Sequence, residues 1–179
     1  MAVNITYFVH GTTVDNIEHK ATGCLDGELS EKGIEQSIVL KQQIDINKYE
    51  VIFSSDLQRA IDSAKYTFGN LKLIVEDKRL RECNYGDLNG KDSTLVEYEK
   101  HINDKFPNGE SLIDVEKRIR DFCNYLKNNY NNKNIAIVAH RAPQLALQVI
   151  TENKTWEEVI SSDWRKTKSW QPGWNYVYN

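Results

Sequence analysis

The sequence contains little cysteine, and its three cysteines are scattered. Cys24, Cys83 and Cys123 are odd in number and form no CxxC pair, which is typical of free thiols in a reducing compartment. No apolar run approaches about 18 residues, so we expect no membrane span. The first residues lead directly into a strand-like run, without a basic and apolar signal pattern. We therefore expect a cytoplasmic protein that does not act at a membrane.

The sequence also lacks a strong excess of charge and any linker-like stretch. Its formal net charge of −3 argues against binding nucleic acid over a wide surface, although a local basic pocket is compatible with it. Neither a GxxxxGK loop nor an HExxH pair occurs, so P-loop nucleotide hydrolysis and zinc-protease chemistry fit poorly. With 179 residues, 40% of them hydrophobic, the chain is typical of one domain over residues 1–179 with a sizeable core.

What the sequence does contain is an alternation of strand-like and helix-like segments. This alternation predicts an α/β fold, a three-layer α/β/α sandwich whose central sheet is mostly parallel. We also expect a functional loop over 11–29, a short helix near 92–101 and an edge strand of undetermined type at 174–178. The expected core strands cover residues 4–10, 51–53, 71–75 and 134–139, and the main helices begin at Ser30, after Ser54-Ser55-Asp56, at Glu110-Ser111 and near Pro143.

The spacing of apolar residues indicates which face of each helix is buried. Ser30 is a good N-cap residue for the first helix, and the segment Ser54-Ser55-Asp56 is expected to cap the second. The expected inner residues are Ile34, Ile38 and Ile44 in the first helix, Leu57, Ile61, Ala64 and Phe68 in the second, and Leu112, Val115, Ile119, Phe122 and Leu126 in the third.

Side chains suited to phosphate chemistry follow the expected strands. His10 follows the apolar run 5–9, and His140 follows the similar run 135–139. Arg59 lies shortly after the second strand, and Glu82 after the third. In a parallel sheet these points meet at the carboxyl edge, where helix N-termini and arginine side chains can bind an anion. The pattern predicts an anion pocket with a histidine nucleophile and a carboxyl proton donor.

Six segments in order give the chain a resemblance to a known family. The chain resembles the histidine phosphatase superfamily, also called phosphoglycerate mutase-like, over roughly residues 5 to 147. Each segment is weak alone, and their order makes the resemblance specific. The segments are His10-Gly11-Thr12-Thr13-Val14-Asp15-Asn16, the stretch from Gly23 to Gly33 with Gln36, Ser54-Ser55-Asp56-Leu57-Gln58-Arg59-Ala60, Leu80-Arg81-Glu82-Cys83-Asn84-Tyr85-Gly86, Pro107-Asn108-Gly109-Glu110-Ser111 and Val138-Ala139-His140.

The resemblance implies a role for each of several residues. It implies that His10 is the nucleophile that takes the phosphoryl group. Glu82 would protonate the leaving alkoxide and then activate water, which are the roles of a catalytic acid and base. His140, the third implied catalytic residue, would hold the phosphoryl oxygens together with Arg59. The implied phosphate-binding residues are Arg59, Asn16 and Gly11, and no metal or other cofactor is implied.

The chain departs from the family pattern immediately before the nucleophile. The family has an arginine at this position, where this sequence has Val9. A charged hydrogen bond contributes about 1.5–3 kcal/mol, so its loss needs compensation. Arg141 follows His140, where the family usually has glycine. We hypothesise that Arg141 is a phosphate-binding residue that supplies the missing guanidinium.

Each of these residues also has a structural interpretation. A strand-end histidine can be an ordinary core residue, Arg59 and Glu82 can be solvated, Asn16 can be a turn residue and Arg141 can form a salt bridge. Arg81 is better explained as a solvated or structural charge. The aromatic and basic stretch from Trp164 to Trp174 is expected to pack on the core. Its alternative is a wall of the substrate site that stacks on an organic leaving group.

We therefore expect a metal-independent phosphatase that hydrolyses small phosphomonoesters through phosphohistidine. Its partner would be a small phosphorylated molecule and not a nucleic acid. Phosphoglycerate mutase-type phosphoryl transfer uses the same residues and is the first alternative. A degenerate, non-catalytic member that binds a phosphorylated ligand or a protein is the second. The sequence names neither the substrate nor the oligomeric state.

Overall fold

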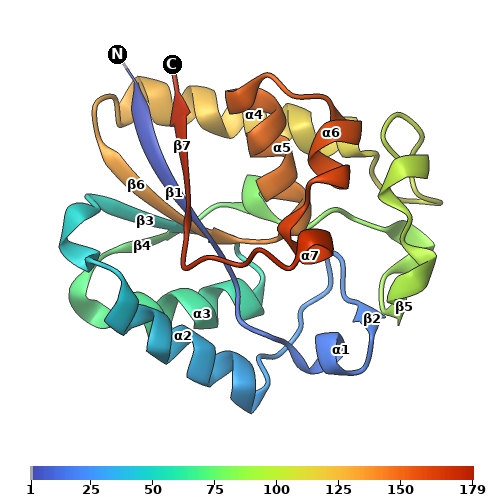
Figure 1. Cartoon of the computed structure of the whole chain (residues 1–179), viewed down its shortest axis with the longest axis horizontal. Coiled ribbons are helices and arrows are strands. Elements are labelled where there is room, and N and C mark those ends of the chain that lie inside the picture. Colours follow the sequence, from blue (N-terminus) through green and yellow to red (C-terminus); the bar gives the residue numbers. More distant parts are fainter. Residues whose placement is uncertain (1) are drawn as a thin grey trace.

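A five-stranded sheet forms the centre of the protein in a computed structural model that describes residues 2–179. The strand order is β4-β3-β6-β1-β7. Neighbouring strands are parallel except for the edge pair of β1 and β7, which is antiparallel (Figure 1). The strands are β1 Val3–Val9, β3 Val51–Ser54, β4 Ile74–Glu76, β6 Asn134–Ala139 and β7 Trp174–Tyr178.

Helices cover both faces of this sheet, as the strand and helix alternation predicts. Side chains of α2 and α3 pack on one face, and those of α4, α5 and α6 pack on the other (Figure 1). The three-layer α/β/α architecture with a mostly parallel sheet is therefore confirmed. The helices are α1 Val14–Ile17, α2 Glu31–Gln43, α3 Gln58–Phe68, α4 Leu112–Asn129, α5 Arg141–Glu152, α6 Trp156–Ser161 and α7 Trp164–Thr167.

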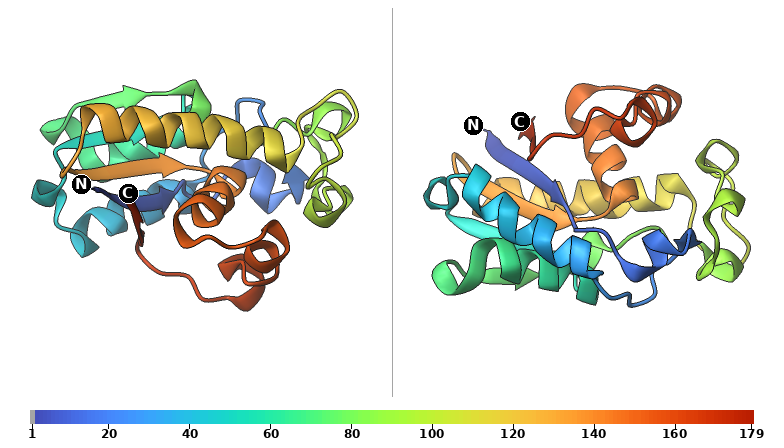
Figure 2. Two further views of the ribbon diagram at one scale, coloured as in Figure 1. Left: turned by 90° about the horizontal axis from the view of Figure 1, so that it is seen from above. Right: turned by 60° about the horizontal axis from the view of Figure 1, so that its bottom comes forward.

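The carboxyl ends of the parallel strands lie at one end of the molecule. Figure 2 shows α1, α7 and a small antiparallel ribbon of β2 Lys20–Ala21 with β5 Lys91–Asp92 beyond that end. The three central strands β3, β6 and β1 are largely buried on both faces, and their side chains point alternately to the two faces. In β1, for example, Ile5 and Tyr7 join the core under α4 and α5, whereas Phe8 joins the core under α2 and α3. A rigid sheet thus carries the residues that follow its strands.

Several expected elements differ in detail. The loop over 11–29 contains α1 and β2. The strand expected at 71–75 begins only at Ile74, because residues 69–71 form a 3₁₀ turn. The helix expected near 92–101 is two 3₁₀ turns, Ser93–Leu95 and Tyr98–Lys100.

Two expectations about helix packing and capping are wrong. Ile38 is 44% exposed, because the buried residues of α2 are Gly33, which lies against the loop after β1, and Ser37, which contacts α3. The residues 54–56 do not cap α3, whose N-cap position is Leu57. Ser55 instead accepts a hydrogen bond at Oγ from the Leu57 N–H, at 3.3 Å.

The apolar faces of the other helices agree with expectation. Ser30 caps α2 by accepting a hydrogen bond from Gly33. The predicted inner residues of α3 and α4 are all buried. The segment 174–178 is an edge strand, as expected, and its antiparallel direction is now defined. Within residues 2–179, no helix has the length and apolar character needed to cross a membrane.

Candidate active site

Two histidine rings meet at the ends of two adjacent parallel strands. Val9 of β1 is in register with Ala139 of β6, so the next residues of the two strands, His10 and His140, lie side by side. The His10 N–H donates to the Ala139 carbonyl at 3.1 Å, which continues the strand pairing to the nucleophile position. The ring centroids are 5.0 Å apart and the ring planes make an angle of 60°. The expected meeting of the two imidazoles is confirmed as geometry.

The two rings differ in their hydrogen bonds. His10 Nδ1 is 2.8 Å from the Gly11 carbonyl oxygen. Because a carbonyl can only accept, this contact places the ring proton on Nδ1 and leaves the lone pair on Nε2. Neither ring nitrogen of the buried His140 has a hydrogen-bond partner within the described chain. Its backbone is fixed instead, since Tyr7 Oη donates to the His140 carbonyl at 2.7 Å and accepts from its N–H at 3.0 Å.

Both imidazoles are neutral at neutral pH in the unliganded protein. Burial, followed by the charge of Arg59, lowers the pKa of His10 to about 3. Burial lowers the pKa of His140 well below its usual value, and the charge of Arg59 acts in the same direction. An unprotonated Nε2 is what a nucleophile needs. The positive charge of the site therefore comes from arginines.

Arg59 supplies one of these charges from the first turn of α3. Only 2% of this residue is exposed, which is unusual for an arginine. Its Nη1 donates to the Leu25 carbonyl and its Nη2 to the Gly23 carbonyl, both at 2.7 Å. The loop between α1 and α2 thus holds the guanidinium in place. Each Nη keeps a second N–H, and Nε keeps its own, for an anion in the cavity.

Glu82 lies at the N-terminus of α5, beside the residues that follow β6. Its Oε1 accepts from the N–H groups of Cys83 at 2.8 Å and Ala142 at 3.0 Å, and its Oε2 accepts from the Arg141 N–H at 3.1 Å. Negative side chains are stabilised at this end of a helix. Glu82 therefore accepts the N–H groups at the N-terminus of α5, which were expected to bind phosphate.

The N-terminus of α3 is engaged as well. The Gln58 N–H donates to Asp26 Oδ1 at 3.2 Å. The expectation of a free helix N-terminus is therefore wrong for α5, because Glu82 occupies its first N–H groups, and at α3 Asp26 occupies the N–H of Gln58.

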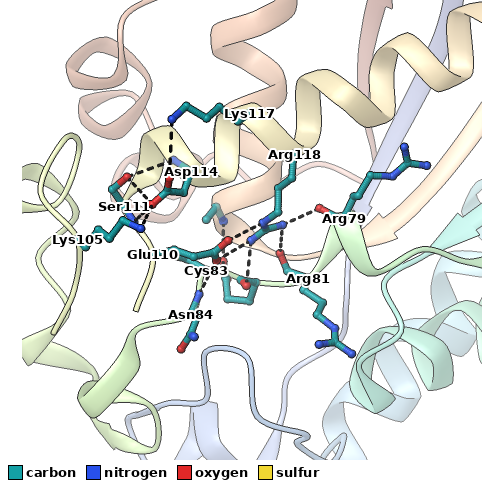
Figure 3. Close-up of polar contacts among 12 residues, drawn as sticks. Arg79, Arg81, Cys83, Asn84, Lys105, Glu110, Ser111, Asp114, Lys117 and Arg118 are labelled. Carbon is teal, nitrogen blue, oxygen red and sulfur yellow. Dashed lines mark hydrogen bonds and ion pairs between the residues drawn. The ribbon is translucent and has the colours of Figure 1, made fainter. Parts of the chain in front are cut away.

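A brace that sequence reasoning missed holds the loop that bears Glu82 (Figure 3). Arg118 of α4 donates to the carbonyls of Arg79 at 2.6 Å, Arg81 at 2.7 Å and Glu82 at 3.2 Å. Its guanidinium also pairs with Glu110 in a bidentate contact of 2.9 and 3.1 Å. Glu110 Oε2 in turn accepts the Asn84 N–H at 2.9 Å. The only signal for this brace in the sequence was the segment 107–111, whose role the residues alone did not reveal.

Gly11 and Asn16 have structural partners beside the site. The Gly11 N–H donates to Ser63 Oγ at 2.9 Å. A Cβ at Gly11 would lie 2.3 Å from the Gly33 carbonyl oxygen, so only glycine fits between the histidine loop and α2. Asn16 is exposed, and its Oδ1 accepts the Thr13 N–H at 3.0 Å to complete a capping box on α1. Both residues line the same cavity as His10.

Arg141 has an ion-pair partner, Asp163. Its Nε donates to Asp163 Oδ2 at 2.7 Å, and the Asp163 side chain is fully buried. Its guanidinium lies 4.2 Å from the ring centre of Tyr98. Arg81, by contrast, pairs with Asp56 at 2.7 Å and is exposed, in agreement with its expected structural role.

A cavity of about 750 Å³ joins these side chains. Trp164 and Trp170 form part of its wall, whereas Trp156 and Trp174 are buried in or against the core. The aromatic segment therefore both packs on the core and lines the cavity. Within residues 2–179, no three His, Cys, Asp or Glu side chains are grouped in the manner of metal ligands. The lining residues with chemistry are His10, Arg59, Glu82, Arg141 and Arg165.

The fold and the site define a class of protein, an α/β sandwich with a histidine pair and arginines at the carboxyl edge of its sheet. Residues 7–169 match the family model described as histidine phosphatase superfamily (branch 1). The chain belongs to this superfamily, and the resemblance proposed from the six segments is confirmed.

Relatives and solved structures agree with this assignment. The chain is 32% identical to phosphoserine phosphatase 1 of Hydrogenobacter thermophilus over 142 residues, which is 70% of this chain but only 64% of that enzyme. It is 28% identical to the 2,3-bisphosphoglycerate-dependent phosphoglycerate mutase of Bartonella tribocorum, over 86% of this chain and 84% of the mutase. The structure of mycobacterial hydrolase 1 superposes with a TM-score of 0.79 at 26% identity, covering 89% of this chain and 86% of the hydrolase. The predicted enzyme class, a histidine phosphatase, is thereby confirmed.

Proposed function

We propose that this protein is a metal-independent phosphatase that hydrolyses small phosphomonoesters through a phosphohistidine intermediate. The observation that carries the proposal is the imidazole pair at a ring separation of 5.0 Å, with the proton of His10 fixed on Nδ1 by Gly11. A single phosphoryl group fits between two such rings, because reacting atoms must approach to about 3–3.5 Å. Phosphatases among the relatives support the same reaction class.

In the first step, His10 Nε2 attacks phosphorus and the bond from phosphorus to the ester oxygen breaks. The electron pair leaves on that oxygen, which takes a proton from the Glu82 carboxyl group. Positive charge then develops on the His10 ring, and the Nδ1–H···O contact with Gly11 stabilises it. The backbone N–H groups around Glu82 keep its carboxyl group oriented toward the cavity.

In the second step, water attacks the phosphohistidine. The Glu82 carboxylate takes a proton from this water, and the electrons of the N–P bond return to His10 Nε2. Inorganic phosphate leaves, and the site regains a protonated Glu82 and a neutral His10. Glu82 thus acts as the acid in one step and as the base in the next.

The phosphoryl oxygens need positive charge in both steps, and arginines supply it. Arg59 is one source, and we propose that Arg141 is another, in place of the arginine that the family pattern expects at Val9. Val9 and Arg141 both line the cavity. His140 would donate a proton to a phosphoryl oxygen once the dianion is bound. Asn16 would add its side-chain N–H groups, and the Gly11 N–H could add another only by leaving Ser63.

Hydrolysis of p-nitrophenyl phosphate in the presence of EDTA tests the proposal. We expect turnover by the wild type, loss of turnover in His10→Ala, and no stimulation by added divalent metal. Equal rates for the two proteins would contradict the proposal and favour a non-catalytic phosphate-binding protein. Metal-stimulated turnover would reject the mechanism.

Phosphoryl transfer to a second substrate is the alternative that a relative favours, since the Bartonella tribocorum protein is a phosphoglycerate mutase. The two functions differ in what attacks the phosphohistidine. Single-turnover experiments with a labelled phosphomonoester, with and without 3-phosphoglycerate, separate them. We expect labelled inorganic phosphate in both cases. Label that moves to 3-phosphoglycerate faster than to water would favour the mutase.

Hydrolysis rates measured for a panel of phosphorylated metabolites, including phosphoserine, would identify the substrate. We expect the best substrate to be a small monoester, and we expect phosphorylated nucleic acid to be a poor one. The predictions of one domain over residues 1–179 and of a cytoplasmic location remain predictions.

A further inference from the structure

We propose that Arg165 binds the reacting phosphoryl group, and that Asp163 is the positioning residue that holds Arg165 and Arg141 at the cavity. This proposal deepens the phosphohistidine function and rests on it. It adds a guanidinium, from α7, to those of Arg59 and Arg141.

One buried carboxylate serves both arginines. Asp163 Oδ2 accepts from Arg141 Nε at 2.7 Å, and Asp163 Oδ1 accepts from Arg165 Nη1 at 3.1 Å. Oδ1 also accepts the backbone N–H of Arg165 at 3.1 Å, which fixes the start of α7. The Asp163 side chain is fully buried, and a buried carboxylate needs such partners. One negative charge therefore faces two positive charges, and one positive charge is left for another anion.

Aromatic side chains fix the plane of each guanidinium. Arg165 lies over Trp164, with 4.3 Å between its Cζ and the ring centre. Trp164 stacks on Trp174 of β7 at 5.2 Å, and its Nε1 donates to Gln144 of α5 at 3.1 Å. Trp164, against which Arg165 lies, is therefore attached to two elements of the main fold, although α7 itself is short. Stacking and a carboxylate contact together leave its Nε and Nη2 without a hydrogen-bond partner among those found within residues 2–179.

Arg165 is close enough to act on the imidazoles. It lines the cavity together with His10 and Arg59. After the larger effects of burial and Arg59, the charge of Arg165 lowers the pKa of both His10 and His140. The same field would stabilise negative charge on a phosphoryl group placed between the rings.

The charges around the cavity suit a dianion. With Glu82 protonated, as the first step requires, Arg59, Arg141 and Arg165 carry three positive charges and Asp163 carries one negative charge, and both imidazoles are neutral. The set therefore has a net charge of +2 before substrate binds, equal and opposite to the charge of a phosphoryl dianion. Without Arg165 its net charge would be +1, and half of the charge of the dianion would be left unbalanced.

Kinetics and orthovanadate inhibition of the full chain test the proposal. In Arg165→Gln, we expect kcat/KM for p-nitrophenyl phosphate to fall, and the inhibition constant for orthovanadate to rise, each by about 10- to 100-fold. Arg165→Lys retains the charge and is expected to recover part of both losses. The matched control is Lys166→Gln, which removes a neighbouring exposed cation that pairs with Glu99. We expect wild-type values for this control.

The positioning role of Asp163 has a separate readout. In Asp163→Asn, we expect the additional loss caused by Arg165→Gln to shrink, because Arg165 is no longer aimed at the site. This non-additivity is measured in a double-mutant cycle on the orthovanadate inhibition constant. Full additivity would overturn the role of Asp163. The thermal unfolding temperature of each variant identifies any variant that does not fold. If Asp163→Asn or Arg165→Gln does not fold, the comparison of Arg165→Lys with Lys166→Gln in kcat/KM and orthovanadate inhibition tests the role of Arg165.

The proposed function and this inference can fail separately. If His10→Ala retains wild-type turnover, the phosphohistidine function itself is wrong. If His10→Ala abolishes turnover, but Arg165→Gln matches Lys166→Gln in both kcat/KM and orthovanadate inhibition, then the function stands and Arg165 does not bind the phosphoryl group.

Discussion

The two histidines occupy equivalent positions on adjacent strands, yet their surroundings differ. His10 follows β1, and its ring is oriented by a hydrogen bond to the Gly11 carbonyl. His140 follows β6 at the N-cap position of α5, its side chain makes no capping hydrogen bond, and Tyr7 fixes its backbone. The sheet register thus brings both rings to one place, and the local hydrogen bonds give them different chemistry.

For the proposed mechanism, this difference favours His10 over His140 as the nucleophile. A nucleophilic imidazole needs one nitrogen free and the opposite nitrogen supported by an acceptor, because the ring becomes positive when it is phosphorylated. His10 meets both conditions, and His140 lacks the acceptor. Symmetry in the strand pairing therefore does not imply exchangeable roles.

The largest expected effect separates the two rings. His10→Ala should lower turnover by at least about 10⁴-fold, since it removes the nucleophile. His140→Ala should lower it by about 10²- to 10³-fold, as for the loss of one group that stabilises transition-state charge. The measurement is kcat for p-nitrophenyl phosphate at saturating substrate.

The acid-labile phosphate that a phosphohistidine carries distinguishes the two histidines directly. After a rapid quench with labelled substrate, acid-labile phosphate should be found on His140→Ala and be absent from His10→Ala. Label on His140 in the wild type, located by peptide mapping under alkaline conditions, would reverse the assignment.

The second effect concerns Arg59 and Arg141, two arginines that line the cavity together with His10. Arg141→Ala should lower kcat/KM as severely as Arg59→Ala, by about 10- to 100-fold, if it provides the guanidinium that Val9 does not. Arg81→Ala is the control, because this arginine pairs with Asp56 and is exposed. Wild-type activity in Arg141→Ala would limit that residue to its ion pair with Asp163.

The sequence was informative about the sheet and the strand-end histidines for a physical reason. Apolar runs before His10 and His140 define buried parallel strands, and parallel strands bring their carboxyl ends together whatever the intervening chain does. The brace of Arg118 and the carboxylate of Asp163 could not be found in this way. Each depends on contacts between segments that are distant in sequence, such as Arg118 with the carbonyl of Arg79.

Contacts between segments that are distant in sequence also explain why the expectations for Ile38 and for the helix N-termini were wrong. Ile38 has helical spacing with Ile34, yet the close approach of Gly33 and Ser37 to the rest of the fold rotates it outward. The helix N-termini were expected to be free because sequence does not show that Glu82 reaches α5. Composition and periodicity identify elements, whereas the partner of a polar group is a property of the packed structure.

A smaller effect is expected at Tyr7, whose hydroxyl group bonds the backbone of His140 but not that of His10. Tyr7→Phe leaves the buried N–H of His140 without its acceptor, at a cost of about 1–3 kcal/mol in the free energy of unfolding. Turnover should fall only a few-fold, because the ring of His140 keeps its packing. Tyr176→Phe is the matched control, since this buried tyrosine has only a 3.4 Å contact with Gln144. Equal destabilisation of the two variants in urea would show that the Tyr7 contacts have no special weight.

The smallest expected effect is a loss of stability at low pH, to which both His10 and His140 contribute. Their pKa values in the folded protein are lowered, to about 3 for His10 and well below the usual value for His140, whereas an unfolded histidine titrates near about 6.5. Above that pH both states are neutral, so the histidines add no pH dependence. As the pH falls below about 6.5, the two histidines are protonated in the unfolded chain but stay neutral in the folded chain, so the free energy of unfolding decreases.

Urea unfolding at pH values from about 7.5 to 5.5 checks the sign and the division between the rings. We expect the free energy of unfolding to fall by about 1 kcal/mol for His140 between about pH 6.5 and 5.5, and by less for His10, whose side chain is partly exposed. His140→Gln should therefore remove more of the decrease than His10→Gln. A wild-type stability that rises in this window would mean that the rings take up protons on folding, and it would remove the basis for a neutral nucleophile.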